Sequence, residues 1–519
     1  MFDSIFKSEK KSCTYNMLAN SAVGIFVTIC QVILNYAVRI VFVNTLGAEI
    51  NGLHNLFQSL INVMLLMESG FSTALIIHMY KPVEMNDQAG IIEVMSFYKR
   101  VYTTVACFLI IVGLLVDAFF LDKLITTTIP MMHVRIYFFA FVLAFALYYN
   151  TYYKKSILFA NQQNRVNTWA MFVSELVFRI FEVIAVVRLH QYLAFLILMI
   201  FEKLFCNTIL NIYVDRHYPY LRNFRSVRVS DKIKRSVFKT VKPILVFNIS
   251  STVQQSAKGI LISCLMGNIR MVGYYGNYQM VAGAATLLYG QLGGAYTSAI
   301  GNLAVSGNKE KVYHFYRNCS FWMNWCAILI AAGICTCIQD FIMMTFGREY
   351  LLPMNCTIVV VMDMLTYLFS IPIISVQNAV GLHHLDQKYM VIQTITAIIL
   401  GFIGGNYFGI PGIVSGLILP QILFTLFYKG ICINKTAFGK GPLMHIRMMT
   451  GEIIKSAAVI SVCLMVCSLI STGNPVINFL TKGITTVGVC VLLCCLSSWR
   501  SPYFQKIFTI AKWNKRKGI

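Results

Sequence analysis

The stretch Asp215–Lys242, DRHYPYLRNFRSVRVSDKIKRSVFKTVK, is the longest strongly polar run in a very apolar chain. It carries nine Lys or Arg residues against two acids, Asp215 and Asp231. A basic tract of this size can bind nucleic acid, but apolar helical segments flank it on both sides. Cytoplasmic loops of membrane proteins carry an excess of Lys and Arg, which anionic lipid attracts. The stretch therefore predicts a cytoplasmic linker that contacts anionic membrane lipid and joins two halves of a membrane protein, with no nucleic acid partner.

The composition of the whole chain agrees with this interpretation. Of its 519 residues, 57% are hydrophobic and 12% are charged, and the mean hydropathy is +0.68. Soluble domains contain about 25% charged residues. The 16 Cys form no zinc pattern and fall largely in apolar runs, where Cys behaves as a small hydrophobe. The chain has no phosphate-binding P-loop and no metal-binding motif, so no cofactor is expected.

A membrane-spanning helix needs about 20 mostly apolar residues. This criterion predicts an all-α polytopic membrane protein with about 14 transmembrane helices. They cover residues 20–43, 51–76, 101–121, 133–153, 168–187, 191–213, 243–266, 272–303, 318–343, 352–380, 389–407, 410–431, 448–471 and 475–497. The predicted inner loops and tails hold most of the 43 Lys and Arg, whereas the outer ends carry Lys123, Arg135, Arg188, Arg270 and Arg348. This alternation predicts that both termini are cytoplasmic.

Two parts of the chain share a series of motifs in the same order. The first series is Leu46-Gly47, Gly52, Gln58 and FSTAL at 71–75, and the second is Met266-Gly267, Gly273, Gln279 and YTSAI at 296–300. Six predicted spans separate them, so the two series have the same orientation, which predicts a parallel pseudo-repeat about the membrane normal. The expected domains are an N-terminal six-helix bundle (1–214), the basic cytoplasmic linker (215–242), a C-terminal six-helix bundle (243–434), and two extra helices with a basic C-terminal tail (435–519).

The run FVNTLGAEINGLHNLFQSLINVMLLMESGFSTAL (42–75) resembles the first-to-second-helix signature of bacterial polysaccharide flippases. The segment LISCLMGNIRMVGYYGNYQMV (261–281) is similar to their seventh-to-eighth-helix junction. These lipid-linked oligosaccharide flippases belong to the multidrug/oligosaccharidyl-lipid/polysaccharide exporter superfamily, with the multidrug and toxin extrusion transporters and the lipid II flippase. The resemblance implies two bundles that move undecaprenyl-diphosphate-linked oligosaccharide across the bacterial cytoplasmic membrane by alternating access, for capsule or exopolysaccharide assembly. It also implies a cationic cavity lined by helices one, two, seven and eight.

Two cations lie inside predicted spans, where ionisable residues are costly and point to function. Arg39 lies eight residues before Gly47, and Lys258 lies nine before Gly267. At 1.5 Å per residue, each lies about 12 Å inside the end of its helix. Facing each other from the two bundles, they would suit a diphosphate, with Arg as a bidentate fork and Lys as a point charge. The alternative is that each side chain snorkels to the outer headgroups.

Other polar residues in the spans are candidates for substrate binding or ion coupling. Gln58, Asn62 and Gln279 could donate to sugar hydroxyls or hold helices together, and Asn62 lies four residues after Gln58 on the same helix face. Glu68 could pair with Lys258 or Arg39, carry a coupling proton, or form a structural ion pair. Asp363 is a candidate proton or cation site, or the partner of a base. Candidate coupling ions are H⁺ and Na⁺.

Two further sets of charged residues in the spans are weaker candidates for a role in transport. Glu175, Arg179 and Glu182 form one stripe of a helix and are expected to neutralise one another. Lys482 is a weaker candidate for the cavity.

Two other classes of protein compete with the flippase interpretation. A cation-coupled multidrug exporter of the same superfamily would need acids in its cavity, whereas Arg39 and Lys258 favour an anionic substrate. A membrane polysaccharide polymerase or acyltransferase would need a catalytic loop, and the loops here are short and lack a His- or Asp-based constellation. The sequence therefore predicts a transport protein, not an enzyme, that functions as a monomer without catalytic residues.

Overall fold

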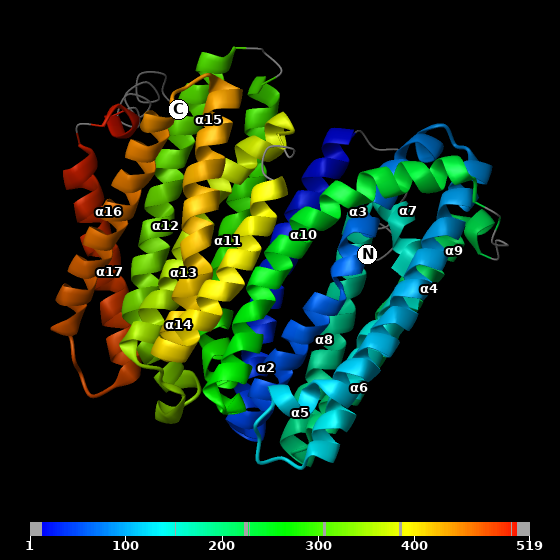
Figure 1. The fold of residues 1–519 in the computed structure, drawn as a ribbon, viewed down its shortest axis with the longest axis horizontal. Coiled ribbons are helices and arrows are strands. Elements are labelled where there is room, and N and C mark those ends of the chain that lie inside the picture. The colour runs from blue at the N-terminus through cyan, green and yellow to red at the C-terminus, as the bar shows by residue number, and fades with distance from the viewer. Residues whose placement is uncertain are drawn as a thin grey trace, which may run out of the picture. The chain divides into compact units, whose positions relative to one another are not determined.

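The computed structural model describes residues 13–150, 152–222, 227, 229–304, 308–382, 387–499 and 501–505. These residues form helices and short connections, with no strand among them (Figure 1). The long helices are α2 (Cys13–Met64), α3 (Leu66–Glu84), α4 (Gln88–Phe119), α6 (Met131–Asn150), α8 (Asn164–Leu189), α9 (Tyr192–His217), α10 (Asp231–Met266), α11 (Ile269–Ala304), α12 (Lys309–Thr345), α13 (Met354–Val380), α14 (Gln387–Gln421), α16 (Pro442–Ser468) and α17 (Pro475–Ser498). Shorter helices are α5 (Leu121–Leu124), α7 (Ser156–Ala160), α15 (Gly430–Phe438), the 3₁₀ turns η1 (Tyr152–Lys155), η2 (Pro219–Leu221) and η3 (Arg348–Tyr350), and the π-helix η5 (Ile422–Lys429).

Every predicted span corresponds to helical segments, but two pairs of spans are joined by a kink in place of a loop. α2 contains the first span and the start of the second, interrupted at Gly47 (φ 83°, ψ 174°). α14 contains the eleventh span and most of the twelfth, interrupted at Gly409 (φ 63°, ψ −142°). Glycine adopts a positive φ without the steric cost that a Cβ imposes. Each kink therefore depends on its glycine.

Many of the helices are long and apolar enough to cross a membrane. Among the described residues, nine helical stretches meet this description by length and composition; Tyr389–Phe438 contains two predicted spans, and Val23–Met64 contains most of the first and the start of the second. The long helices α3, α8, α10 and α11 fall outside the nine, and of these α8 and α10 carry several charged residues. The chain is a multi-pass membrane protein in which some helices hold charge inside the bundle.

The chain divides into two compact units, Met1–Gly273 and Tyr274–Ile519. The first unit includes α10, which packs along α3 and α2. The predicted division had placed this helix in the C-terminal bundle. The predicted linker 215–242 is also partly helical, because α9 extends to His217 and α10 begins at Asp231, with the Ser230 side chain as its N-cap. Residues 223–226 and 228 of that linker lie outside the described part of the chain.

In the first unit, the helices pack in antiparallel neighbours. α4 packs on α6, α8 on α9, and both α6 and α2 contact this second pair; the α4 and α6 ribbons run side by side in Figure 1. Aromatic side chains fill the centre, where the rings of Phe57 and Phe138 lie 5.2 Å apart and both are fully buried. Between membrane helices, close packing of such rings contributes to association, because burial from lipid supplies little hydrophobic driving force.

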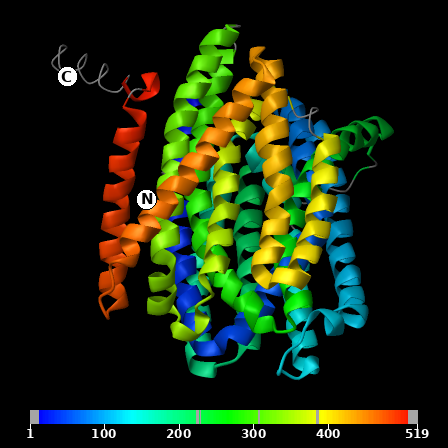
Figure 2. The same cartoon turned by 60° about the vertical axis from the view of Figure 1, so that its left-hand side comes forward.

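In the second unit, α12 is the central helix and contacts α13, α16 and α17. Figure 2 shows α16 and α17, in orange and red, as neighbouring helices near the C-terminal end of the chain. The fully buried residues of this unit include Ala327, Ile328, Ala331 and Ala332 of α12. Small side chains allow close approach of membrane helices, so other helices can pack against several faces of α12.

Candidate functional site

The Gly47 kink brings Arg39 to the second arm of α2. Arg39 and Asn55 lie eight residues on either side of Gly47, and Arg39 Nη2 donates to Asn55 Oδ1 at 2.7 Å. Asn55 Nδ2 in turn donates to the Val272 carbonyl oxygen at 3.4 Å. Arg39 Nε is buried and has no hydrogen-bond partner among the described residues. The guanidinium is therefore oriented by an uncharged amide and keeps unused donor capacity.

Lys258 lies on α10 beside the same stretch of α2. The next residue, Gly259, packs so closely on Ser59 that an added Cβ would lie 2.6 Å from the Ser59 hydroxyl. That hydroxyl donates to the Asn55 carbonyl oxygen at 3.0 Å. The backbone of α10 next to Lys258 therefore lies against residues 55–59 of α2, and Arg39 and Lys258 both belong to the first compact unit, whereas the sequence predicted them in opposite bundles.

The three neutral polar candidates make local hydrogen bonds. Gln58 Nε2 donates to Asn62 Oδ1 at 2.9 Å, so the two side chains share a helix face as their spacing predicts. In the second unit, Gln279 Nε2 donates to the Tyr275 hydroxyl at 2.6 Å. Asp363 of α13 lies within electrostatic range of that hydroxyl. Each unit thus carries a hydrogen-bonded pair of polar side chains that includes one of the two repeat-related glutamines.

Glu68 lies in the first turn of α3, directly after the helix break at Leu65. The Tyr102 and Tyr149 hydroxyls donate to its two carboxylate oxygens at 3.2 and 3.4 Å, and Lys155 lies within electrostatic range. These groups surround Glu68, for which the sequence left open a pairing with Lys258 or Arg39, a coupling proton or a structural ion pair. A buried acid with hydroxyl donors can bind or release a proton without breaking a salt bridge.

Lys155 was missed by the sequence analysis because it falls in a loop at the edge of a predicted span. It belongs to η1, is buried, and donates to the Tyr148 hydroxyl. Burial is the main reason that the pKa of Lys155 falls to about 7, and the neighbouring Lys203 ammonium lowers it further. The sequence gives no sign that Lys155 is buried beside Tyr148 and within electrostatic range of Glu68, because the fold brings these residues together.

The charged stripe of α8 is an ion-pair network, as its spacing predicts. Arg179 Nη1 lies 2.6 Å from Glu182 Oε2, and Arg179 Nη2 lies 3.8 Å from Glu175 Oε1. Gln31 of α2 donates to Glu175 at 2.6 Å. On α9, Lys203 pairs with Glu202 at 2.8 Å. These acids and bases largely neutralise one another inside the first unit.

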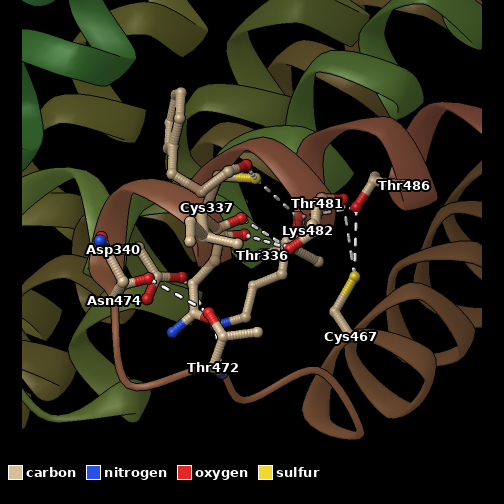
Figure 3. A network of polar contacts seen from close by, with 12 residues as sticks. Thr336, Cys337, Asp340, Cys467, Thr472, Asn474, Thr481, Lys482 and Thr486 are labelled. Atoms are coloured by element: carbon tan, nitrogen blue, oxygen red, sulfur yellow. Dashed lines mark hydrogen bonds and ion pairs between the residues drawn. The ribbon is translucent and has the colours of Figure 1, made fainter.

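Lys482 is paired in the same way in the second unit. Its ammonium lies 2.7 Å from Asp340 Oδ2, and both side chains are largely buried (Figure 3). Beside them, the Thr336 and Thr486 hydroxyls are 2.9 Å apart, and Cys467 Sγ lies 3.4 Å from Thr486. The network joins α12, α16 and α17, so Lys482 holds helices together and its charge is cancelled.

Comparison with known proteins establishes the fold. No protein-family model and no curated protein sequence matches the chain. Among solved structures, the lipid II flippase MurJ in an inward closed conformation matches with a TM-score of 0.66 at 13% identity, over 93% of this chain and 99% of that one. An inward-facing multidrug resistance MATE family transporter of the MOP superfamily has a TM-score of 0.66 at 12% identity, over 80% and 99%.

A MOP superfamily transporter from Pyrococcus furiosus, whose binding pocket is described as having a reversed polarity that suggests a different function, matches with a TM-score of 0.51 at 12% identity, over 81% of this chain and 96% of that one. The protein is thus an all-α polytopic membrane protein with the two-bundle fold of the MATE and MurJ transporters. The similar structures are of transporters and not of enzymes.

Proposed function

We propose that the protein is a flippase that moves undecaprenyl-diphosphate-linked oligosaccharide across the bacterial cytoplasmic membrane for surface polysaccharide assembly. The observation that carries the proposal is the environment of Arg39. Its hydrogen-bond partner is the uncharged Asn55 amide, and no described carboxylate forms an ion pair with it. A cation left with its charge inside a membrane bundle is costly unless a ligand uses it. A diphosphate, which accepts bidentate hydrogen bonds from Arg, fits that requirement.

Lys258 and the amides beside it extend the same site. Lys258 directly precedes Gly259, which packs on Ser59 of α2, and in the proposed site it adds a second positive charge for the diphosphate. Gln58 and Asn62 present amide groups one and two turns further along α2 and would contact sugar hydroxyls. In the proposed transport cycle, Gln279 serves the same purpose from the second unit.

Ion coupling and topology complete the proposal. Glu68, at the break between α2 and α3, is the proposed carrier of a coupling proton, and Asp363 is the proposed proton or Na⁺ site of the second unit. Both termini and the basic linker face the cytoplasm, where the linker binds anionic lipid. The protein acts as a monomer by alternating access.

A cation-coupled multidrug exporter is the second candidate, because the MATE transporter matches this fold with the same TM-score as the lipid II flippase. The two candidates differ in the charge of the substrate. Organic cations would require acids at the substrate site, where Arg39 is a cation; Glu175, Glu182 and Glu202 are paired with bases, and Glu68 is held by two tyrosine hydroxyls. The charge distribution therefore favours an anionic substrate.

A transport assay with purified protein in liposomes separates the candidates. The substrate is a fluorescently labelled undecaprenyl-diphosphate saccharide, quenched from outside by an impermeant reductant, and the competitor assay follows uptake of a fluorescent organic cation. We expect the protein to accelerate quenching of the inner-leaflet lipid and to leave the cation outside. Cation uptake without lipid movement would replace the flippase proposal with the exporter. An altered lipid product, in place of a moved one, would indicate the enzyme.

A further inference from the structure

The segment that follows α17 packs its aromatic side chains on α12. The Tyr503 ring lies 5.9 Å from that of Phe321, and the Phe504 ring stacks on that of Trp322 at 5.9 Å. Trp499, at the end of α17, is 61% exposed. Tyr and Trp gather at the headgroup level of a bilayer, because their rings are apolar and their tips are polar. This aromatic cluster therefore marks the depth of the lipid headgroups in the second unit.

Arg317 of α12 lies in this cluster and has no acidic partner among the described residues. Its guanidinium carbon lies 5.8 Å from the centre of the Tyr503 ring, which is a cation–π distance. Its Nε is buried without a hydrogen-bond partner, and no described residue forms a hydrogen bond or an ion pair with the guanidinium. Contact with a ring orients a cation but does not cancel its charge. Arg317 is therefore a positive charge at headgroup depth whose hydrogen-bond donors are unused.

Lys455 of α16 contacts the same cluster, but an acid cancels its charge. Its ammonium lies 5.7 Å from the centre of the Phe321 ring and 2.7 Å from the Glu452 carboxylate. The other acid near this end of α12 is Glu310, two turns before Arg317, and it pairs with a lysine of the connection after α15 at 3.0 Å. Both acids are therefore used by lysines, and the charge of Arg317 is left over.

A phosphate group fits the unused donors. The planar guanidinium of Arg317 donates two parallel hydrogen bonds to phosphate oxygens. The indole N–H of Trp322, which bonds no described residue, can add a third. Basic sites between membrane helices near the membrane surface bind the headgroups of anionic lipids. The sequence beyond Gln505 carries five Lys or Arg and no Asp or Glu, which attracts anionic lipid toward this end of the chain.

We propose that Arg317 and Trp322 form a binding site for the phosphate of an anionic phospholipid, covered by Tyr503 and Phe504. The phosphate oxygens accept hydrogen bonds from the two Nη nitrogens of Arg317 and from the Trp322 indole, while the acyl chains stay in the bilayer. The bound lipid joins α12 to the segment that follows α17. The site lies in the second compact unit and does not depend on the identity of the transported substrate.

Tryptophan fluorescence of the full-length protein in phosphatidylcholine vesicles tests the site, because Trp322 lies in it. The probe is phosphatidylglycerol with brominated acyl chains, which quench a neighbouring indole, and brominated phosphatidylcholine is the zwitterionic comparison. We expect brominated phosphatidylglycerol to reach half of its quenching at a mole fraction about tenfold lower than brominated phosphatidylcholine, because Arg317 favours a lipid with net negative charge. Equal half-points for the two lipids in the wild type would overturn the proposal.

Substitutions at Arg317 test which residue makes this preference. Arg317→Gln removes the charge and leaves no acid unpaired, so it should fold and bring the two half-points together. Arg317→Lys keeps the charge without the guanidinium fork and should lower the preference for phosphatidylglycerol, which provides a second test if Arg317→Gln does not fold. A preference equal to that of the wild type in either folded variant would overturn the role of Arg317.

A matched pair of charges in the same cluster is the control. The double variant Glu452→Gln, Lys455→Gln removes a cation whose charge is already cancelled, so it should keep the full preference for phosphatidylglycerol. A loss equal to that in Arg317→Gln would overturn the assignment to Arg317. Inorganic phosphate, compared with chloride at equal ionic strength, should leave the quenching unchanged. Displacement of the lipid by inorganic phosphate would assign the site to a soluble phosphate and overturn the lipid proposal.

Discussion

Arg39 and Arg179 are both arginines in long helices of the first unit, and they differ in their partners. Arg179 lies between two carboxylates, at 2.6 Å from Glu182 and 3.8 Å from Glu175. Arg39 bonds the neutral amide of Asn55 at 2.7 Å. A carboxylate cancels a positive charge and an amide oxygen only orients it. The difference separates a cation that holds the bundle together from one whose charge is available to an anionic ligand.

The largest expected effect is on folding. Arg179→Met leaves Glu182, which is 0% exposed, without its counter-ion, and an uncompensated buried charge costs about 3–5 kcal/mol. Arg39→Met is the matched control, since it leaves only an amide behind. We expect the yield and thermal stability of purified Arg179→Met to fall sharply and those of Arg39→Met to change little. Equal losses in both variants would erase the distinction between the two sites.

Lys155 is intermediate between Arg39 and Arg179 in its partners. It is a buried base that donates to the Tyr148 hydroxyl and has the Glu68 carboxylate within electrostatic range. Its pKa of about 7 in the folded protein lies below that of the unfolded chain, so the unfolded state binds more protons between pH 7 and 10.5. Stability should therefore rise with pH across this window. Lys155→Met removes this pH dependence. The free energy of unfolding of the variant minus that of the wild type should therefore decrease by about 2–3 kcal/mol from pH 6 to pH 9.

Thermal unfolding in detergent at the two pH values measures this effect. Lys154→Met is the adjacent control, because Lys154 pairs with Asp215 at 2.7 Å. It should change stability by a similar amount at both pH values. A pH-independent effect of Lys155→Met would show that the buried amine does not titrate in this range.

Asn55→Asp converts the environment of Arg39 into that of Arg179. The new carboxylate pairs with the guanidinium and cancels the charge intended for the diphosphate. A charged hydrogen bond contributes about 1.5–3 kcal/mol, so affinity for undecaprenyl diphosphate should fall about ten- to a hundredfold. Asn55→Ala keeps the charge and should retain binding. If Asn55→Asp binds as tightly as the wild type, Arg39 does not contact the anion.

The smallest expected effect concerns the neutral amides. Gln279→Leu removes a donor whose described partner is the Tyr275 hydroxyl, and a neutral hydrogen bond contributes about 0.5–1.5 kcal/mol. Transport of a lipid-linked saccharide should slow by no more than about tenfold. Binding of undecaprenyl diphosphate without sugar should stay unchanged. A loss for the sugar-free lipid as well would assign Gln279 to packing.

The fold was largely predictable because each membrane span can be recognised from the length and apolar composition of its sequence. The kinks at Gly47 and Gly409 were not, since a positive φ lets one continuous helix replace a predicted loop. The boundary of the units was also different: α10 follows a basic linker in sequence but packs on α2 and α3. Spacing along a chain does not reveal which neighbouring bundle a helix joins.

The site was predictable only in part. Charges inside apolar runs identified Arg39, Lys258 and Glu68, and helical spacing identified the Gln58–Asn62 pair and the α8 network. Asn55 could not be recognised, because an asparagine in a helix is common and its meaning comes from Arg39 across the kink. The ion pair of Asp340 with Lys482 could not be recognised either, because the two residues lie far apart in the sequence and only the packing of α17 on α12 brings them together.

The most direct test of the central claim is transport by the Arg39→Ala, Lys258→Ala double variant in proteoliposomes. If both cations bind the diphosphate, movement of labelled undecaprenyl-diphosphate saccharide should fall at least a hundredfold, since each charged hydrogen bond contributes about 1.5–3 kcal/mol. Membrane abundance and thermal stability should stay near the wild type. Lys258→Arg should keep much of the activity, and Lys258→Glu should lose it. Normal transport by the correctly inserted double variant would contradict the account, and the two cations would then be lipid-facing anchors.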